Sequence, residues 1–160
     1  IIRQVSTPVS RTETAQELYD RLAQLGGELL VETVTAIADG TAQRTPQDPA
    51  EVTLAPMLSR ELSPIDWTRT AAQIHDQVRG LLPWPVASTD LFGGDKVKIF
   101  TTVETEDKTG KEPGTILRAD KAGIDVACGD GTVLRITELQ APGSRRMAAA
   151  DYLRGHPITV

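Results

Sequence analysis

In this chain of 160 residues, the spacing of apolar residues changes from a helical to a strand period at Pro83-Trp84-Pro85. Before these prolines, apolar side chains recur every three or four positions, which predicts amphipathic helices. After them, over residues 86–139, apolar and polar side chains alternate in short runs separated by glycine turns. Alternation of this kind is typical of antiparallel strands. The sequence therefore predicts helices followed by a small β-rich domain.

Short strands are expected throughout the segment that follows the change. They cover residues 86–92, 96–103, 115–119, 124–128 and 132–139, with Gly93-Gly94-Asp95 and Gly129-Asp130-Gly131 as turn signals. Short strands at such close spacing favour a small closed β-barrel of the oligonucleotide/oligosaccharide-binding (OB) type. Residues 147–154 predict a final short helix. The expected fold class is mixed α+β, with an OB-like antiparallel barrel at the C-terminal end and a leading helix before it.

The first part of the chain predicts a helical segment and a linker. Residues 1–9 predict a short strand, and Thr14 with Glu17 has the form of a capping box that starts a helix. The Gly26-Gly27 pair costs a helix about 2 kcal/mol relative to two alanines. We therefore expect two consecutive helices with a bend between them, ending at Gly40.

Two further boundaries follow from breaks in the pattern. Prolines interrupt any periodicity over residues 41–63, which predicts an extended linker. A helix is then expected with Thr68 as its N-cap and Gly80 near its end. These boundaries divide the chain into three expected parts, residues 1–40, 41–63 and 64–160.

Composition limits the chemistry that the chain can carry. A single cysteine excludes a disulfide framework, and with only two histidines a zinc site of the Cys/His type is not expected. No run of about 18 apolar residues occurs, so no membrane span is predicted. His75 has no serine or cysteine nearby to activate, and the acidic loop around Glu104 is expected to be wet. We predict no catalytic residue, no metal site and no bound cofactor in this chain.

Positive charge gathers late in the chain, although the net charge is −5. Residues 1–63 carry five arginines against nine acids, whereas residues 64–160 are close to neutral and hold all five lysines. Cations on or beside the predicted strands could share a face that binds phosphates; they are Lys96, Lys98, Arg118, Lys121, Arg135, Arg145 and Arg146. Lysines on strands also protect sheet edges, and charge alone favours that interpretation. Trp67 and Trp84 could stack on bases, although such indoles are more often packing anchors.

An ordered series of segments resembles one known family. In the second half these segments are Ile65-Asp66-Trp67, Arg79-Gly80-Leu81-Leu82-Pro83-Trp84-Pro85, Pro113-Gly114-Thr115-Ile116, Leu139-Gln140-Ala141-Pro142-Gly143 and Arg145-Arg146-Met147. Upstream they are Leu18-Tyr19-Asp20-Arg21-Leu22-Ala23 and Val52-Thr53-Leu54-Ala55-Pro56. Taken in order, they resemble the C-terminal portion of methionyl-tRNA formyltransferases.

The resemblance implies an activity and a division of labour. Members of that family transfer a formyl group from 10-formyltetrahydrofolate to the amino group of methionyl-initiator tRNA, in the cytoplasm, for translation initiation. Their catalytic Asn, His and Asp lie upstream of the residues that match Ile1-Ile2. The resemblance thus implies a truncated chain: residues 1–40 end a Rossmann-like catalytic domain, residues 41–63 are the linker, and residues 64–160 form a tRNA-binding barrel.

Residues can also be assigned to the contact with tRNA. Arg145 and Arg146 match a basic run of the family and are expected to contact tRNA, and the other five cations are assigned to that contact from their strand positions. We expect a monomer that binds initiator tRNA and no membrane, holds no folate and is inactive alone. We also expect residues 1–40 to be the less stable part, because their leucines would lack a packing surface.

Two alternatives to this assignment remain open. The barrel could belong to a related folate-dependent formyl hydrolase or sugar-nucleotide formyltransferase. It could also be a stand-alone interaction barrel that is no part of an enzyme.

Overall fold

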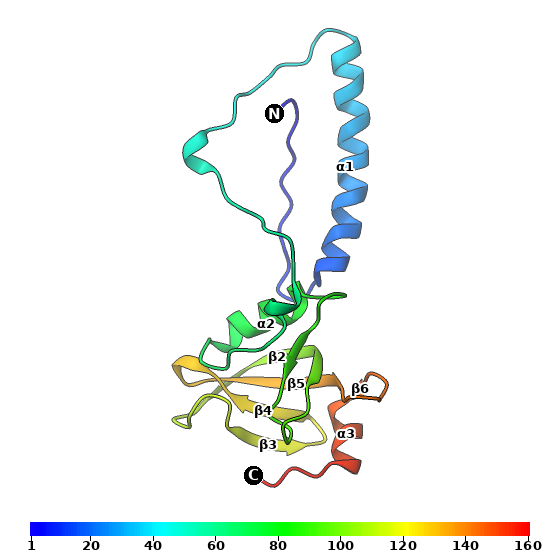
Figure 1. The fold of residues 1–160 in the computed structure, drawn as a ribbon. Coiled ribbons are helices and arrows are strands. Elements are labelled where there is room, and N and C mark those ends of the chain that lie inside the picture. The colour runs from blue at the N-terminus through cyan, green and yellow to red at the C-terminus, as the bar shows by residue number, and fades with distance from the viewer. The chain divides into compact units, whose positions relative to one another are not determined.

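The computed structural model describes residues 1–160, which divide into two units, Ile1–Met57 and Leu58–Val160. The first unit contains helix α1 (Ala15–Ala38) and the short 3-10 helix η1 (Pro49–Glu51). The helices of the second unit are η2 (Arg60–Leu62), α2 (Ala71–Gly80), η3 (Gly129–Gly131) and α3 (Ala149–Gly155) (Figure 1). The boundary between the units lies inside the expected linker, and the division at residues 40 and 63 stays a prediction.

Helix α1 is continuous along its whole length. It begins with the predicted capping box, in which the Thr14 hydroxyl accepts from the Glu17 N–H and the Glu17 carboxylate accepts from the Thr14 N–H. The bend expected at Gly26-Gly27 is wrong, since the helix runs through both glycines. Glycine weakens a helix but keeps its amide N–H, so unlike proline it leaves the ladder of hydrogen bonds intact.

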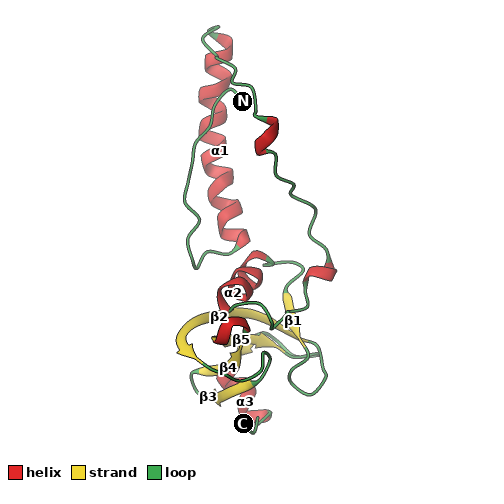
Figure 2. Ribbon diagram, turned by 90° about the vertical axis from the view of Figure 1, so that its left-hand side faces the viewer, coloured by secondary structure: helices red, strands yellow, loops and turns green.

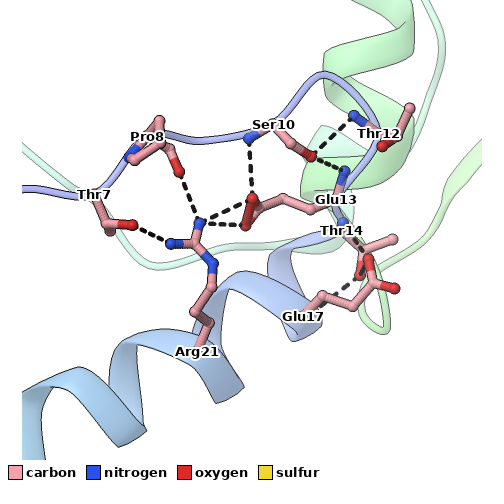
Figure 3. A network of polar contacts seen from close by, with 8 residues as sticks. All are labelled: Thr7, Pro8, Ser10, Thr12, Glu13, Thr14, Glu17 and Arg21. Atoms are coloured by element: carbon pink, nitrogen blue, oxygen red, sulfur yellow. Dashed lines mark hydrogen bonds and ion pairs between the residues drawn. The ribbon is translucent and has the colours of Figure 1, made fainter.

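The segment before α1 is extended but is not a strand. Ile1 exchanges two backbone hydrogen bonds with Thr45, at 2.9 and 2.8 Å. No ladder follows, so the strand predicted over residues 1–9 is wrong: beyond Ile1, no neighbouring segment pairs with it. The guanidinium of Arg21 ties the segment to α1, because it donates to the Pro8 carbonyl at 2.8 Å and pairs with the Glu13 carboxylate at 2.8 Å (Figure 3).

Helix α2 begins two residues later than predicted. Its N-cap is Thr70, whose hydroxyl accepts from the Gln73 N–H while the Gln73 side chain accepts from the Thr70 N–H. Thr68 donates both its N–H and its hydroxyl to the Asp66 carboxylate instead. The capping role expected of Thr68 is therefore wrong, because Thr70 and Gln73 form the reciprocal pair that a capping box requires.

The second unit is built on one antiparallel sheet of six strands. In chain order these are β1 (Ala87–Thr89), β2 (Val97–Lys108), β3 (Ile116–Asp120), β4 (Gly123–Ala127), β5 (Thr132–Gln140) and β6 (Met147–Ala148). Neighbouring strands follow the order β1-β2-β5-β4-β3 (Figure 2). Strand β6 pairs with β5. Strand β6 was not predicted, and it takes the first residues of the helix expected over 147–154. The sequence thus located the sheet, while β1 is shorter and β2 is longer than predicted.

The sheet is open in its hydrogen bonding. No pairing joins β1 to β3, the two ends of the strand order, so the closed barrel is not confirmed. Strand β2 nevertheless changes register against β5 at three places, between Ile99 and Thr101, between Thr101 and Thr102, and between Glu104 and Lys108. Irregularities of this kind bend and twist a strand, which lets the long β2 pair with both β1 and β5.

One core holds the second unit together. Helix α2 packs against β2 and β5 and contributes the fully buried Ile74 and Val78. The sheet supplies most of the other fully buried side chains, namely Val97, Ile99, Ile124, Val126, Val133, Leu134, Ile136 and Leu139. In the first unit only Ala36 of α1 is buried. None of the helices combines the length and the apolarity that a membrane-spanning helix needs.

Candidate nucleic-acid interface

Two of the predicted phosphate-binding cations share one acidic partner. In the sheet, Asp125 of β4 lies beside Arg118 of β3 and Arg135 of β5. Its carboxylate accepts from Arg118 at 2.8 and 2.5 Å and from Arg135 at 2.6 and 3.0 Å. The Asp125 side chain is only 4% exposed. Burial raises the pKa of this carboxyl, and Arg118 opposes that shift.

The Asp125 contacts give Arg118 and Arg135 a structural role. A buried carboxylate without its cationic partners would carry a large desolvation cost. The two arginines offset part of that cost and join three neighbouring strands. Much of their charge is therefore compensated inside the domain. Their assignment to tRNA contact, which the structure does not test, is the alternative to this structural role.

Arg146 is also engaged within the domain. Its guanidinium pairs with the Glu138 carboxylate and lies 4.7 Å from the centre of the Phe100 ring, a cation–π contact. The Thr101 hydroxyl donates to the same carboxylate at 2.5 Å. Both partners lower the pKa of Glu138, and the hydrogen bond from Thr101 has the largest effect, followed by the one from Arg146. Arg145, by contrast, is exposed and has no acidic partner.

The remaining three cations lie in two hollows. Lys121 follows β3 and lines a small hollow with Asp120 and Arg154. Lys96 and Lys98 lie at the start of β2, where their exposed side chains alternate with the buried Val97 and Ile99. Alternation places both lysines on the outer face of the sheet.

Lys96 and Lys98 line a concave surface that we call the basic hollow. Its volume is about 460 Å³, and its lining residues are Arg60, Ser63, Trp84, Pro85, Val86, Ser88, Lys96 and Lys98. Three of them are cationic and none is acidic. Neither lysine nor Arg60 has an acidic partner in the structure. The basic hollow thus gathers three of the chain's cations without a carboxylate to neutralise them.

Backbone pairing fixes the geometry of the basic hollow. Ser88 of β1 lies opposite Lys98 of β2. On its other side, the Ser88 N–H donates to the Ser63 carbonyl at 2.7 Å, and the Ile65 N–H donates to the Ser88 carbonyl at 2.9 Å. These bonds hold the segment that follows η2 alongside β1. They carry Arg60 to the same surface as the two lysines.

Two residues of the basic hollow are not among the site residues predicted from the sequence. Arg60 comes from the acidic first part of the chain, and only the pairing of Ser63 with Ser88 brings it to β2. For Trp84, the sequence favours a packing anchor over a base-stacking residue. The structure separates the two tryptophans: Trp67 is 8% exposed and its indole N–H donates to Thr89, whereas Trp84 is 50% exposed.

No group of His, Cys, Asp and Glu side chains is arranged to hold a metal ion. The lone thiol, Cys128, is buried in the core, and burial raises its pKa to about 11. A thiol in that state is a poor nucleophile at neutral pH.

Solved structures show where this fold occurs. The match to HypX from Aquifex aeolicus spans 92% of this chain and 27% of the HypX chain, with a TM-score of 0.64 at 22% identity. An N-formyltransferase from Helicobacter canadensis covers 84% of this chain and 48% of its own length, with a TM-score of 0.61 at 19% identity. The fold is thus one that formyltransferases use.

Sequence comparison then places the chain within a family. Residues 57–157 match the family model described as formyl transferase, C-terminal domain, and the chain belongs to this family. Methionyl-tRNA formyltransferase from Acetivibrio thermocellus is 45% identical over 94% of this chain, and that from Bacillus subtilis is 39% identical over 97%. The chain spans about half the length of these relatives, 48% and 49%. The predicted family resemblance is confirmed.

Proposed function

We propose that this chain is the C-terminal portion of a methionyl-tRNA formyltransferase and that its second unit binds the tRNA substrate. Relatives of that name match it at 38–45% identity over 94–99% of its length. In this proposal the formyl group passes from 10-formyltetrahydrofolate to methionyl-initiator tRNA in the cytoplasm. The catalytic Asn, His and Asp belong to the part of the enzyme that this chain does not match, so the chain is inactive alone.

The folate and the finer fold belong to the same proposal. A structure of HypX in complex with tetrahydrofolic acid covers 79% of this chain at 25% identity, with a TM-score of 0.57, which supports a folate cosubstrate for the whole enzyme. The irregular pairing of β2 with β5 supports an OB-like curl of the sheet. We place residues 64–160 in that tRNA-binding domain and residues 41–63 in the linker before it.

The observation that carries tRNA binding is the basic hollow. Phosphate groups bind where cations gather without acidic neighbours, because each neutralised phosphate releases condensed counterions. Arg60, Lys96 and Lys98 meet that condition in a chain whose net charge is −5. The acidity of the chain is no obstacle, since the hollow itself contains no acid.

The test is a filter-binding titration of the chain with initiator tRNA over a range of salt concentrations. The variant is Lys96→Glu/Lys98→Glu, and the matched control is Lys108→Glu/Lys111→Glu, which reverses two exposed lysines outside the hollow. We expect the slope of log affinity against log salt to fall by about 2 in the variant and by much less in the control. Equal slopes for the two variants would remove the basic hollow from the interface.

A further inference from the structure

The exposed tryptophan points to a more specific ligand for the basic hollow. Nucleic-acid-binding proteins that recognise single strands combine cations along a groove with aromatic rings on which bases stack. The basic hollow has both parts, since Trp84 lies among its lining residues with Arg60, Lys96 and Lys98. Half of the Trp84 surface remains open to solvent. Its ring is thus available to a ligand, which the ring of Trp67 is not.

The backbone holds Trp84 in a defined place. Proline fixes the φ angle on both sides of it, at Pro83 and Pro85. The next residue, Val86, has φ of +68° and its N–H donates to the Leu81 carbonyl at 3.0 Å. A β-branched residue in the left-handed region is strained, and strain of this kind collects at binding sites. Because the backbone on both sides is constrained, only the side-chain torsions of Trp84 remain to be restricted when a ligand stacks on its ring.

The size and chemistry of the hollow then select a ligand class. Its volume of about 460 Å³ falls within the range of small-molecule sites, roughly 300–1,000 Å³, and it suits one or two nucleotide units better than a helix. Bases inside a duplex are already stacked on their neighbours and offer no face to a protein ring, whereas unpaired bases do. Phosphates on either side of such a base would meet the cations.

We infer that the basic hollow binds an unpaired nucleotide of RNA, with its base stacked on Trp84 and its flanking phosphates on Lys96, Lys98 and Arg60. This inference rests on the proposed function and adds to it. Under the proposed function alone, the cations of the basic hollow could bind tRNA phosphates whether the bases beside them are paired or unpaired. Under the inference, the hollow recognises a single-stranded element of that RNA.

The fluorescence of Trp84 provides the test, with Trp67 as the internal reference. Three ligands are titrated into the chain separately. The first is pentauridylate, the second is an RNA hairpin whose bases are all paired except for those of a short loop, and the third is uridine monophosphate. We expect pentauridylate to quench the exposed component of the emission. The hairpin and the mononucleotide should quench it at least about fivefold less at equal concentration, because each lacks either the free base or the neighbouring phosphates.

Variants separate stacking from charge. Trp84→Ala should weaken the binding of fluorescein-labelled pentauridylate at least about fivefold, and Trp84→Phe, which keeps a ring, should stay within about twofold of the parent. Lys98→Gln should lower the salt slope by about 0.7 for a single strand, and Lys111→Gln should leave it unchanged. Trp84 is half exposed, so circular dichroism should show the same fold for each variant.

The outcomes distinguish the inference from the proposed function. Parent-like binding of pentauridylate by Trp84→Ala, or equal quenching by the paired hairpin, would overturn the inference. Equally tight binding of uridine monophosphate would do the same, because the ligand would then be a free nucleotide. If initiator tRNA binds while pentauridylate leaves the emission unchanged, the inference fails and the proposed function stands. If neither RNA binds, the proposed function fails.

Discussion

Replacing Asp125 with alanine should destabilise the second unit strongly and leave its RNA contacts in place. The substitution removes four hydrogen bonds at 2.5–3.0 Å between one carboxylate and two guanidiniums. Breaking a buried ion pair costs about 3–5 kcal/mol when the remaining partner stays buried. The side chains of Arg118 and Arg135 are 45% and 23% exposed, so solvent screens part of their charge. We therefore expect a loss of about 2–3 kcal/mol.

Thermal unfolding followed by circular dichroism measures this loss. For a unit of roughly 100 residues, a change of that size lowers the midpoint by roughly 10–20 °C. A double-mutant cycle with Arg135→Met should show that much of the loss comes from the pair rather than from either side chain alone.

The same variants test the structural role of the arginines. Arg135→Met should lower the thermal midpoint while the salt slope of tRNA binding, measured well below that midpoint, stays at the parent value. A destabilisation by Asp125→Ala of less than about 0.5 kcal/mol would refute the reasoning, and so would a lower salt slope in Arg135→Met.

Three further predictions concern stability. In Gly129→Ala the new Cβ would lie 1.9 Å from the Thr68 carbonyl oxygen, so thermal unfolding should show a loss of stability of about 3 kcal/mol or more. The control Gly110→Ala, whose new Cβ would have nothing within 4 Å, should be near neutral. The pKa of Glu138 is held below its ordinary value of 4.5, so its stabilising contribution is complete above that pH and disappears as the pH falls through the lowered pKa. Glu138→Gln should thus be less stable than the parent at about pH 6, by a margin that shrinks as the pH falls below 4.5, and a constant difference would contradict this assignment. Hydrogen exchange should be faster in α1, where only Ala36 is buried, than in β4, where every residue is buried; equal protection would show that α1 is stabilised by contacts other than burial.

The features that the sequence predicted well are those that depend on neighbours along the chain. The capping box at Thr14 was visible because both of its partners lie within one turn. The alternation around Lys96 and Lys98 placed the start of β2 to within one residue. The true N-cap of α2 can also be recognised from neighbours along the chain. Thr70 is followed three residues later by Gln73, whereas Thr68 has no such partner.

The features that the sequence missed depend on pairing between distant segments. Strand β6 has only two residues and exists through its register with Glu138 and Leu139 of β5. Residues 1–9 have the composition of a strand but find no ladder. Neither outcome can be read from local periodicity, because each depends on what lies alongside.

The candidate site shows the same division more sharply. All seven cations could be identified from the sequence, but their charge partners could not. Which arginine faces Asp125 is decided by the register of β3, β4 and β5, and a one-residue slip would move every side chain to the other face. Arg60 reaches the basic hollow only through the pairing of Ser63 with Ser88.

The central claim is that RNA binds at the basic hollow, and the indole resonances of the two tryptophans test it most directly. In a two-dimensional NMR spectrum of the 15N-labelled chain, each tryptophan gives one indole N–H signal. Addition of initiator tRNA should shift the signal of the exposed Trp84 together with the backbone amides of Lys96 and Lys98, and it should leave the buried Trp67 unmoved. Shifts confined to the surface around Lys121 and Arg118, with Trp84 unchanged, would contradict the account.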